Sequence, residues 1–167
     1  MSTFVYPMDF KEIIHTGSTC ATAEFLYSGT PESGMLAWLD TKEVKQWWKA
    51  DSVIIEPFHG GIFYLTWQER ESEKQHAIYG IMEKVDTERN IIEVSRIMYI
   101  SPLIKMGHLH LHINFEAVAN GQTKMTLVHT HNYTGHLHSM YNAAVYESWP
   151  KTFALLKKHL EAQTRFS

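Results

Sequence analysis

The sequence predicts an α+β domain in which a curved, seven-stranded antiparallel sheet wraps around one long C-terminal helix. Three observations support this fold class: a strand and two short helices precede residue 52, alternating hydrophobicity runs from residue 53 to residue 133, and helical periodicity follows from residue 141. An antiparallel sheet with one apolar face must bury that face, and the final helix is the only predicted element long enough to cover it. A curved sheet around a single helix also favours a cavity at their interface.

The N-terminal part is predicted to contain one strand and one helix. Residues 1–17 have weak periodicity and are expected to form an extended lead-in, so we place one domain over residues 18–165. Residues 19–27 form the first strand of the predicted sheet. Pro31 then suits the first position of a short helix, whose apolar face is expected to contain Met35, Leu36 and Leu39, with Trp38 beside it.

A second short helix is predicted after Asp40. The Asp40 side chain can accept a hydrogen bond from the first helical turn, and Glu43 can complete a capping box. Val44, Trp47 and Trp48 then share one helical face, because residues three and four apart are neighbours on a helix. This helix therefore places a large aromatic surface on the rest of the domain.

Six further strands are separated by charged or turn-rich segments, which is typical of a meander of antiparallel hairpins. The connection over residues 101–107 is unusually apolar. It could close a cavity mouth, bind a partner or pack on the N-terminal segment, and the sequence leaves these alternatives open. The six strands are expected at residues 53–56, 62–67, 75–85, 91–100, 108–118 and 123–133.

The C-terminal helix is predicted from apolar residues that recur every three or four positions. Pro150 lies inside this pattern, so it either begins the helix or kinks a longer one. The apolar positions are Tyr141, Val145, Trp149, Phe153, Leu156 and Leu160.

Composition excludes several classes of function. The formal net charge of −3 provides no basic surface for nucleic acid. Cys20 is the only cysteine and cannot form an internal disulfide, which indicates a reducing compartment. The N-terminus lacks the features of a signal peptide, and no apolar run reaches the roughly 18 residues of a membrane span. We therefore expect a cytoplasmic protein.

Several spaced motifs between residues 20 and 160 form a recognisable set: Leu39-Asp40 to Trp47-Trp48, Pro57 with Gly60-Gly61, Gly80 before Asp86, Leu127 with His129, and Trp149-Pro150. Together with the order of the predicted elements, these motifs resemble the START/pollen-allergen-like (SRPBCC, helix-grip) superfamily. Within it, the chain resembles the branch of homologues of the heat-shock-protein-90 ATPase activator. Ser148 stands where the family usually has glycine, and the histidine-rich segments exceed the family pattern.

The resemblance implies a shell of sheet and helix around an apolar pocket. The name of the branch also implies a protein-interaction module of co-chaperone type, with a chaperone as partner. Fold alone does not decide between these functions, so the residues themselves must be weighed.

Histidines on two adjacent predicted strands are the strongest chemical signal. His108, His110 and His112 share one face of a strand, and His129 and His131 share one face of the next. A two-residue turn at Asn120-Gly121 would place all five on the same face, where three could bind zinc.

A three-residue loop with Gly121 in the left-handed conformation shifts the pairing by one residue and exchanges the faces. Leu111 would then pair with His129, and Ile113 with Leu127. We favour this register because it collects the apolar residues of both strands on one side. It places the first three histidines on the outer face of the sheet and the last two on the inner face.

We therefore expect the domain to bind a small, largely apolar molecule, as a carrier or sensor, between the sheet and the C-terminal helix. The two inner histidines would orient polar groups of the ligand. No cofactor, metal or catalytic residue is assigned, and a binding role is favoured over an enzymatic one, with a histidine-based or zinc-dependent enzyme as the alternative. A homodimer remains open. The expected pocket residues are Trp47, Trp48, Phe63, Leu65, Trp67, Leu111, Ile113, Leu127, His129, His131, Trp149 and Phe153.

Overall fold

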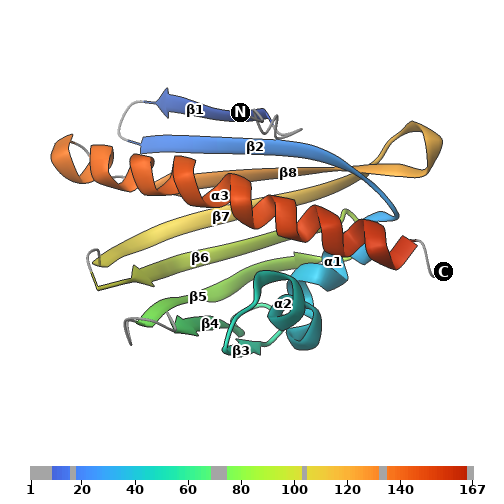
Figure 1. Cartoon of the computed structure of the whole chain (residues 1–167), viewed down its shortest axis with the longest axis horizontal. Coiled ribbons are helices and arrows are strands. Elements are labelled where there is room, and N and C mark those ends of the chain that lie inside the picture. Colours follow the sequence, from blue (N-terminus) through green and yellow to red (C-terminus); the bar gives the residue numbers. More distant parts are fainter. Residues whose placement is uncertain (1–8, 16–17, 69–74, 103–104, 132–134, 165–167) are drawn as a thin grey trace, which may run out of the picture.

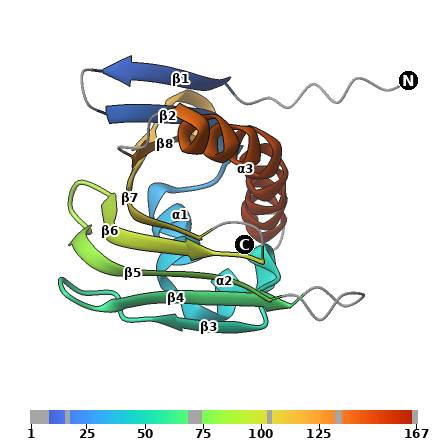
Figure 2. The same cartoon turned by 90° about the vertical axis from the view of Figure 1, so that its left-hand side faces the viewer.

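The computed structural model describes residues 9–15, 18–68, 75–102, 105–131 and 135–164. It confirms the predicted α+β class: one curved antiparallel sheet carries three helices on its concave side (Figures 1 and 2). The strands lie in the order β1-β2-β8-β7-β6-β5-β4-β3. Their bounds are β1 Asp9–His15, β2 Ser18–Ser28, β3 Ser52–Ile55, β4 Ile62–Gln68, β5 Gln75–Asp86, β6 Ile91–Ile100, β7 Lys105–Ala117 and β8 Gln122–His131.

All seven predicted strands are present as β2 to β8, and β1 adds an eighth at the edge of the sheet. This strand comes from the segment that we expected to be an extended lead-in. It pairs antiparallel with β2, from Asp9 opposite Glu24 to His15 opposite Ser18. The sequence signal is weak because an edge strand is held mainly by backbone hydrogen bonds to one neighbour.

Helix α1, Pro31–Leu39, begins as predicted with proline at its first position. The Ser33 amide donates to Thr30 Oγ1 at 3.2 Å, which caps the helix. The predicted apolar face is partly wrong: Leu36 is 53% exposed, whereas Trp38 is 1% exposed. The helix packs through its small residues Gly34 and Ala37, so its buried face is turned by about one residue from the one expected.

Helix α2, Thr41–Trp48, begins where Asp40 accepts hydrogen bonds from the amides of Lys42 and Glu43, at 2.9 and 3.1 Å. The predicted capping box is absent, because the Asp40 amide donates to Leu36 O at 2.8 Å. The Glu43 carboxylate is therefore available elsewhere. It accepts from Gln163 at 2.7 Å and lies 3.0 Å from His159 Nε2, which joins α2 to the C-terminal helix.

The β7–β8 hairpin has the register that burial favoured. Leu111 pairs with His129 and Ile113 with Leu127, around the three-residue loop of residues 119–121. Asn120 is left-handed as well as Gly121, with φ values of 65° and 70°.

Helix α3, Gly135–Thr164, runs along the sheet and contacts β2, α1 and α2 (Figure 1). Pro150 lies inside it, which confirms the longer-helix alternative. No helix in the part of the chain that the structure describes has the length and apolar character needed to cross a membrane. The apolar connection is shorter than predicted, because Lys105–Gly107 already belong to β7, and residues 103–104 lie outside the described residues.

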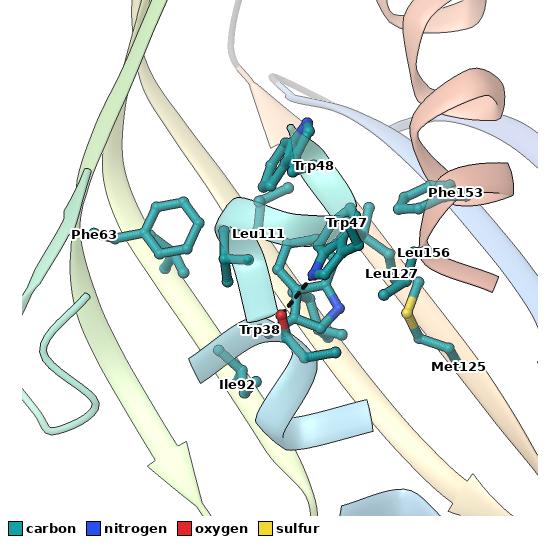
Figure 3. Close-up of a cluster of buried hydrophobic side chains, with 14 of the residues drawn as sticks. Trp38, Trp47, Trp48, Phe63, Ile92, Leu111, Met125, Leu127, Phe153 and Leu156 are labelled. Carbon is teal, nitrogen blue, oxygen red and sulfur yellow. Dashed lines mark hydrogen bonds between the residues drawn. The ribbon is translucent and has the colours of Figure 1, made fainter. Parts of the chain in front are cut away.

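The hydrophobic core is one cluster between the concave face and the helices. Figure 3 shows Trp38, Trp47 and Trp48 from the short helices beside Leu111 and Leu127 from the sheet. The aromatic residues of the two short helices therefore fill the space at one end of α3.

Candidate functional site

The structure buries all but one of the twelve residues that the sequence assigned to a pocket. Trp67 is the exception and is half-buried against the cluster. They come from α2, β4, β7, β8 and α3, so elements far apart in the sequence meet on the concave side of the sheet. The buried ones are Trp47, Trp48, Phe63, Leu65, Leu111, Ile113, Leu127, His129, His131, Trp149 and Phe153.

Aromatic rings form a continuous wall from α2 to α3. Trp47 and Trp48 are stacked at a centroid distance of 5.0 Å, and Trp48 lies 6.1 Å from Trp149. Trp149 is in turn stacked on Phe153 at 4.9 Å, and Trp67 lies 5.3 Å from Trp48. These ring contacts bring the Trp47-Trp48 pair next to Trp149, although about 100 residues separate them in the sequence.

Three of these indole groups are fixed by hydrogen bonds. Trp47 Nε1 donates to Ala37 O at 2.6 Å, and Trp67 Nε1 donates to Trp48 O at 3.0 Å. Trp149 Nε1 donates to His129 Nδ1 at 3.1 Å. The wall therefore has a defined geometry rather than the adaptable packing of an aliphatic core.

His129 is the polar centre of the site. Its side chain stands on the inner face of β8, and the residue is 5% exposed. Burial, together with the nearby His131 and His110, lowers the pKa of His129 from 6.5 to about 3. An indole N–H can only donate, so Nδ1 accepts and the proton of the neutral ring lies on Nε2. Such a weakly basic imidazole is suited to hydrogen bonding rather than to general-base catalysis near pH 7.

His131 is the second inner histidine and is 2% exposed. The outer histidines lie on the opposite face of the sheet, where His112 Nδ1 is 2.9 Å from Glu93 Oε1. The inner and outer sets therefore cannot bind one common ion. No group of three potential metal ligands comes together among the residues that the structure describes.

Sequence reasoning missed two aromatic residues of the wall. Phe25, on β2, lies 6.0 Å from Phe153, and Trp38 lies 5.6 Å from Trp48. Trp38 Nε1 is buried and has no hydrogen-bond partner among the described residues. The signal for Trp38 was present in the helical spacing of Gly34, Ala37 and Trp38, but small residues are a weak mark of a buried face.

Solved structures with this arrangement come from several bacteria. Protein NE0264 from Nitrosomonas europaea has a TM-score of 0.69 at 14% identity, covering 87% of this chain and 96% of that one. Ms6760 from Mycobacterium smegmatis has a TM-score of 0.68 at 15% identity, with coverages of 94% and 96%. SA2116 from Staphylococcus aureus, a protein of unknown function, has a TM-score of 0.66 at 17% identity, with coverages of 90% and 99%. At these identities the likeness shows the fold alone.

The sequence itself gives a more specific relationship. No curated protein matches the chain. The family model described as "Activator of Hsp90 ATPase homolog 1-like protein" matches residues 36–161. That range holds the end of α1, all of α2, the strands from β3 to β8 and nearly all of α3. The tryptophans of the aromatic wall and the inner histidines therefore lie within it. The chain therefore belongs to the family of Activator of Hsp90 ATPase homolog 1-like proteins, within the helix-grip superfamily that its motifs resemble.

Proposed function

We propose that this domain binds a small, largely apolar molecule between the sheet and α3, as a carrier or sensor. The observation that supports this most directly is the hydrogen bond between Trp149 Nε1 and His129 Nδ1 at the end of the aromatic wall. It holds a neutral imidazole inside an apolar core, at a position where an aliphatic side chain would pack at lower cost. An oriented polar group among aromatic surfaces is what a site for a mostly apolar ligand requires.

Intrinsic tryptophan fluorescence tests this proposal, because the indoles of the wall would contact the ligand. We expect some members of a panel of lipids and aromatic metabolites to quench the emission of the purified protein and to raise its melting temperature. His112→Ala serves as the matched control, since it removes an imidazole from the outer face of the same hairpin. It should leave binding unchanged, whereas His129→Ala should weaken it.

The proposal fails if no compound in a broad panel changes either the emission or the melting temperature. Native mass spectrometry of freshly purified protein adds an independent measurement, because a retained ligand adds its mass to that of the chain. A ligand that binds equally well to His129→Ala would place the site away from the wall.

A second candidate is a protein-interaction module, and two observations favour it. One is the family description, and the other is an apolar patch on the outer face of the sheet. Ile62 pairs with Ile81, and Ile54 and Tyr79 both pair with Tyr64 between them. The exposed fractions are 51% for Ile54, 47% for Ile62, 38% for Tyr79 and 36% for Ile81.

A pull-down with a chaperone ATPase distinguishes the two functions. A co-chaperone role predicts binding that Ile62→Glu abolishes and that His129→Ala preserves. A ligand-binding role predicts that, in the fluorescence assay, His129→Ala weakens binding and Ile62→Glu preserves it. The two effects are separable because the two substitutions lie on opposite faces of the sheet.

A further inference from the structure

Trp38 differs from Trp47, Trp67 and Trp149 in one respect. Its side chain is 1% exposed, and its Nε1 donates to no group among the residues that the structure describes. Trp47, Trp67 and Trp149 each donate from Nε1 to an identified acceptor. A buried N–H group without an acceptor loses its hydration and gains nothing in return, so such groups are rare and require an explanation.

The position of this donor connects it to the proposed ligand site. Trp38 meets Trp47 edge-on at 5.4 Å and Trp48 edge-on at 5.6 Å. Figure 3 shows its ring in the middle of the core cluster, between α1 and the sheet residues Leu111 and Leu127. Through Trp48 the same wall continues to Trp149 and to His129. Trp38 Nε1, the donor without an identified acceptor, therefore lies at the end of the aromatic wall that is formed by the two short helices.

The charge of the surroundings limits what can accept this hydrogen bond. The buried polar residues of the described core are Thr66, Thr123, His129 and His131, and none is lysine or arginine. His129 is held neutral by its low pKa. A carboxylate placed here would be buried without a counter-charge, which is strongly unfavourable. A neutral oxygen carries no such penalty.

We propose that the ligand carries an uncharged carbonyl oxygen that accepts a hydrogen bond from Trp38 Nε1. This inference rests on the proposed ligand-binding function and narrows it to apolar ketones, esters or amides. Fatty acids and other carboxylates are excluded by the same reasoning. The aromatic wall supplies the apolar contact area, and Trp38 supplies the directional donor that distinguishes a carbonyl compound from a hydrocarbon of the same shape.

Three naphthalene probes of similar size test this inference. 2-Acetylnaphthalene carries the carbonyl oxygen, 2-ethylnaphthalene lacks it, and 2-naphthoate is anionic. We expect the ketone to bind the wild-type protein roughly two- to tenfold more tightly than the ethyl compound, which is the range for one neutral hydrogen bond. The naphthoate should bind more weakly than either.

The matched variants are Trp38→Phe and Trp47→Phe. Both remove an indole from the same cluster, but only the first removes the donor without an identified acceptor. Trp38→Phe should bring the affinity ratio of ketone to ethyl compound close to one. Trp47→Phe should keep the preference for the ketone, even where both affinities fall because packing is lost.

An NMR measurement on the wild-type protein covers the case in which Trp38→Phe does not fold. The chain has five tryptophans, so its indole ¹⁵N–¹H region contains few resonances. The ketone should move the Trp38 indole proton downfield, and the ethyl compound should not. This readout does not depend on a variant at position 38, because the resonance can be assigned through ring contacts with Trp47 and Trp48.

The outcomes separate this inference from the function on which it rests. If the ketone and the ethyl compound bind equally and the Trp38 resonance responds to neither, the carbonyl inference is wrong while ligand binding stands. If none of the three probes nor any member of the broader panel binds, the proposed function fails and the inference fails with it.

Discussion

The β7–β8 hairpin carries histidines on both faces of the sheet, and the two sets lie in different surroundings. On the inner face, His129 and His131 are at most 5% exposed, and His129 accepts a hydrogen bond from an indole. On the outer face, the side chain of His112 is 35% exposed and contacts Glu93. Successive residues of a strand point to opposite faces of the sheet. In the register of this hairpin, the histidines of β8 lie in the core and those of β7 lie on the outer face.

This difference shows that residue type alone does not assign chemistry. Burial lowers the pKa of His129 to about 3, so the inner ring is neutral at every physiological pH. On the outer face, the hydrogen bond from His112 instead holds the pKa of Glu93 below its ordinary value, with smaller electrostatic contributions from His112, Lys84 and His110. A hydrogen-bonding role within the core follows for His129, whereas His112 makes a partly exposed contact with a carboxylate.

The largest difference between the two faces should appear when Trp149 is removed. Trp149→Ala deletes the stack on Phe153 and leaves His129 Nδ1 without its donor in the core. We expect the free energy of unfolding to fall by roughly 3–5 kcal/mol, the usual cost of truncating a buried tryptophan. Urea denaturation measures it. Tyr79→Ala on the outer face should cost well under half as much, and equal losses would mean that the inner wall has no special role in stability.

How far the sequence could predict this site depends on which force places each residue. Register and facing of the β7–β8 hairpin were predictable, because only one pairing collects Leu111, Ile113 and Leu127 on one side. The extra strand β1 was not predicted, since backbone pairing at an edge leaves little trace in side-chain pattern.

The hydrogen bond between Trp149 and His129 was also beyond the sequence. The two residues are on a helix and a strand, and their contact depends on how α3 crosses the sheet rather than on local spacing. The missing capping box has a similar cause. Glu43 has the right spacing for the box, but its carboxylate accepts from Gln163 on α3 instead. Local propensity predicted the helices, whereas packing between elements decided the partners of their polar side chains.

The low pKa of His129 makes the stability of the fold depend on pH. Its folded pKa of about 3 lies below the ordinary 6.5 of an unfolded chain, so the unfolded state binds more protons between these values. Stability must therefore fall as pH decreases from about 6.5 toward 3, by up to about 1.4 kcal/mol per pH unit for this group. His129→Gln keeps an acceptor for Trp149 and does not titrate. The stability of this variant should therefore lack the part of the pH dependence that comes from His129.

The measurement is the difference in unfolding free energy between wild type and His129→Gln at pH 7, 6, 5 and 4.5. Carboxylates titrate in both proteins and cancel in the difference. Below pH 6, we expect the unfolding free energy of the variant to rise steadily relative to that of the wild type. Parallel curves would mean that His129 binds a proton as readily in the folded state as in the unfolded state.

Burial of the apolar face and the geometry of the loop are the two candidates for what fixes the register of the β7–β8 hairpin. Asn120 and Gly121 both have positive φ, as a type I′ turn requires, and Val118 N donates to Gln122 O at 2.9 Å around them. Deleting Ala119 should leave a two-residue turn with Ala117 still opposite Thr123. We expect the unfolding free energy to change by no more than about 1 kcal/mol.

The matched control deletes Gly121 instead, which gives the same loop length without the residue that best tolerates the left-handed conformation. It should cost roughly 1–2 kcal/mol more than deletion of Ala119. Cross-strand NOEs between Ile113 and Leu127 report whether the register is kept. A loss of several kcal/mol on deleting Ala119 would show that the loop, rather than the apolar face, selects the pairing.

The smallest effect is expected on the outer face, at the pair of His112 and Glu93. The ring nitrogen and the carboxylate oxygen are 2.9 Å apart, and Lys84 Nζ lies 3.7 Å from the other oxygen. His112→Ala should cost less than about 1 kcal/mol near pH 7, because partly exposed pairs are weakened by solvent and salt.

A lowered carboxyl pKa stabilises the fold above the pKa of the unfolded chain, and this contribution disappears as pH falls through the folded value. In the variant, a ¹³C NMR titration should therefore show the pKa of Glu93 moving up toward its ordinary value. If that pKa stays low without His112, then Lys84 rather than the histidine holds the carboxylate, and the outer face lacks the imidazole chemistry that sets it apart from the inner one.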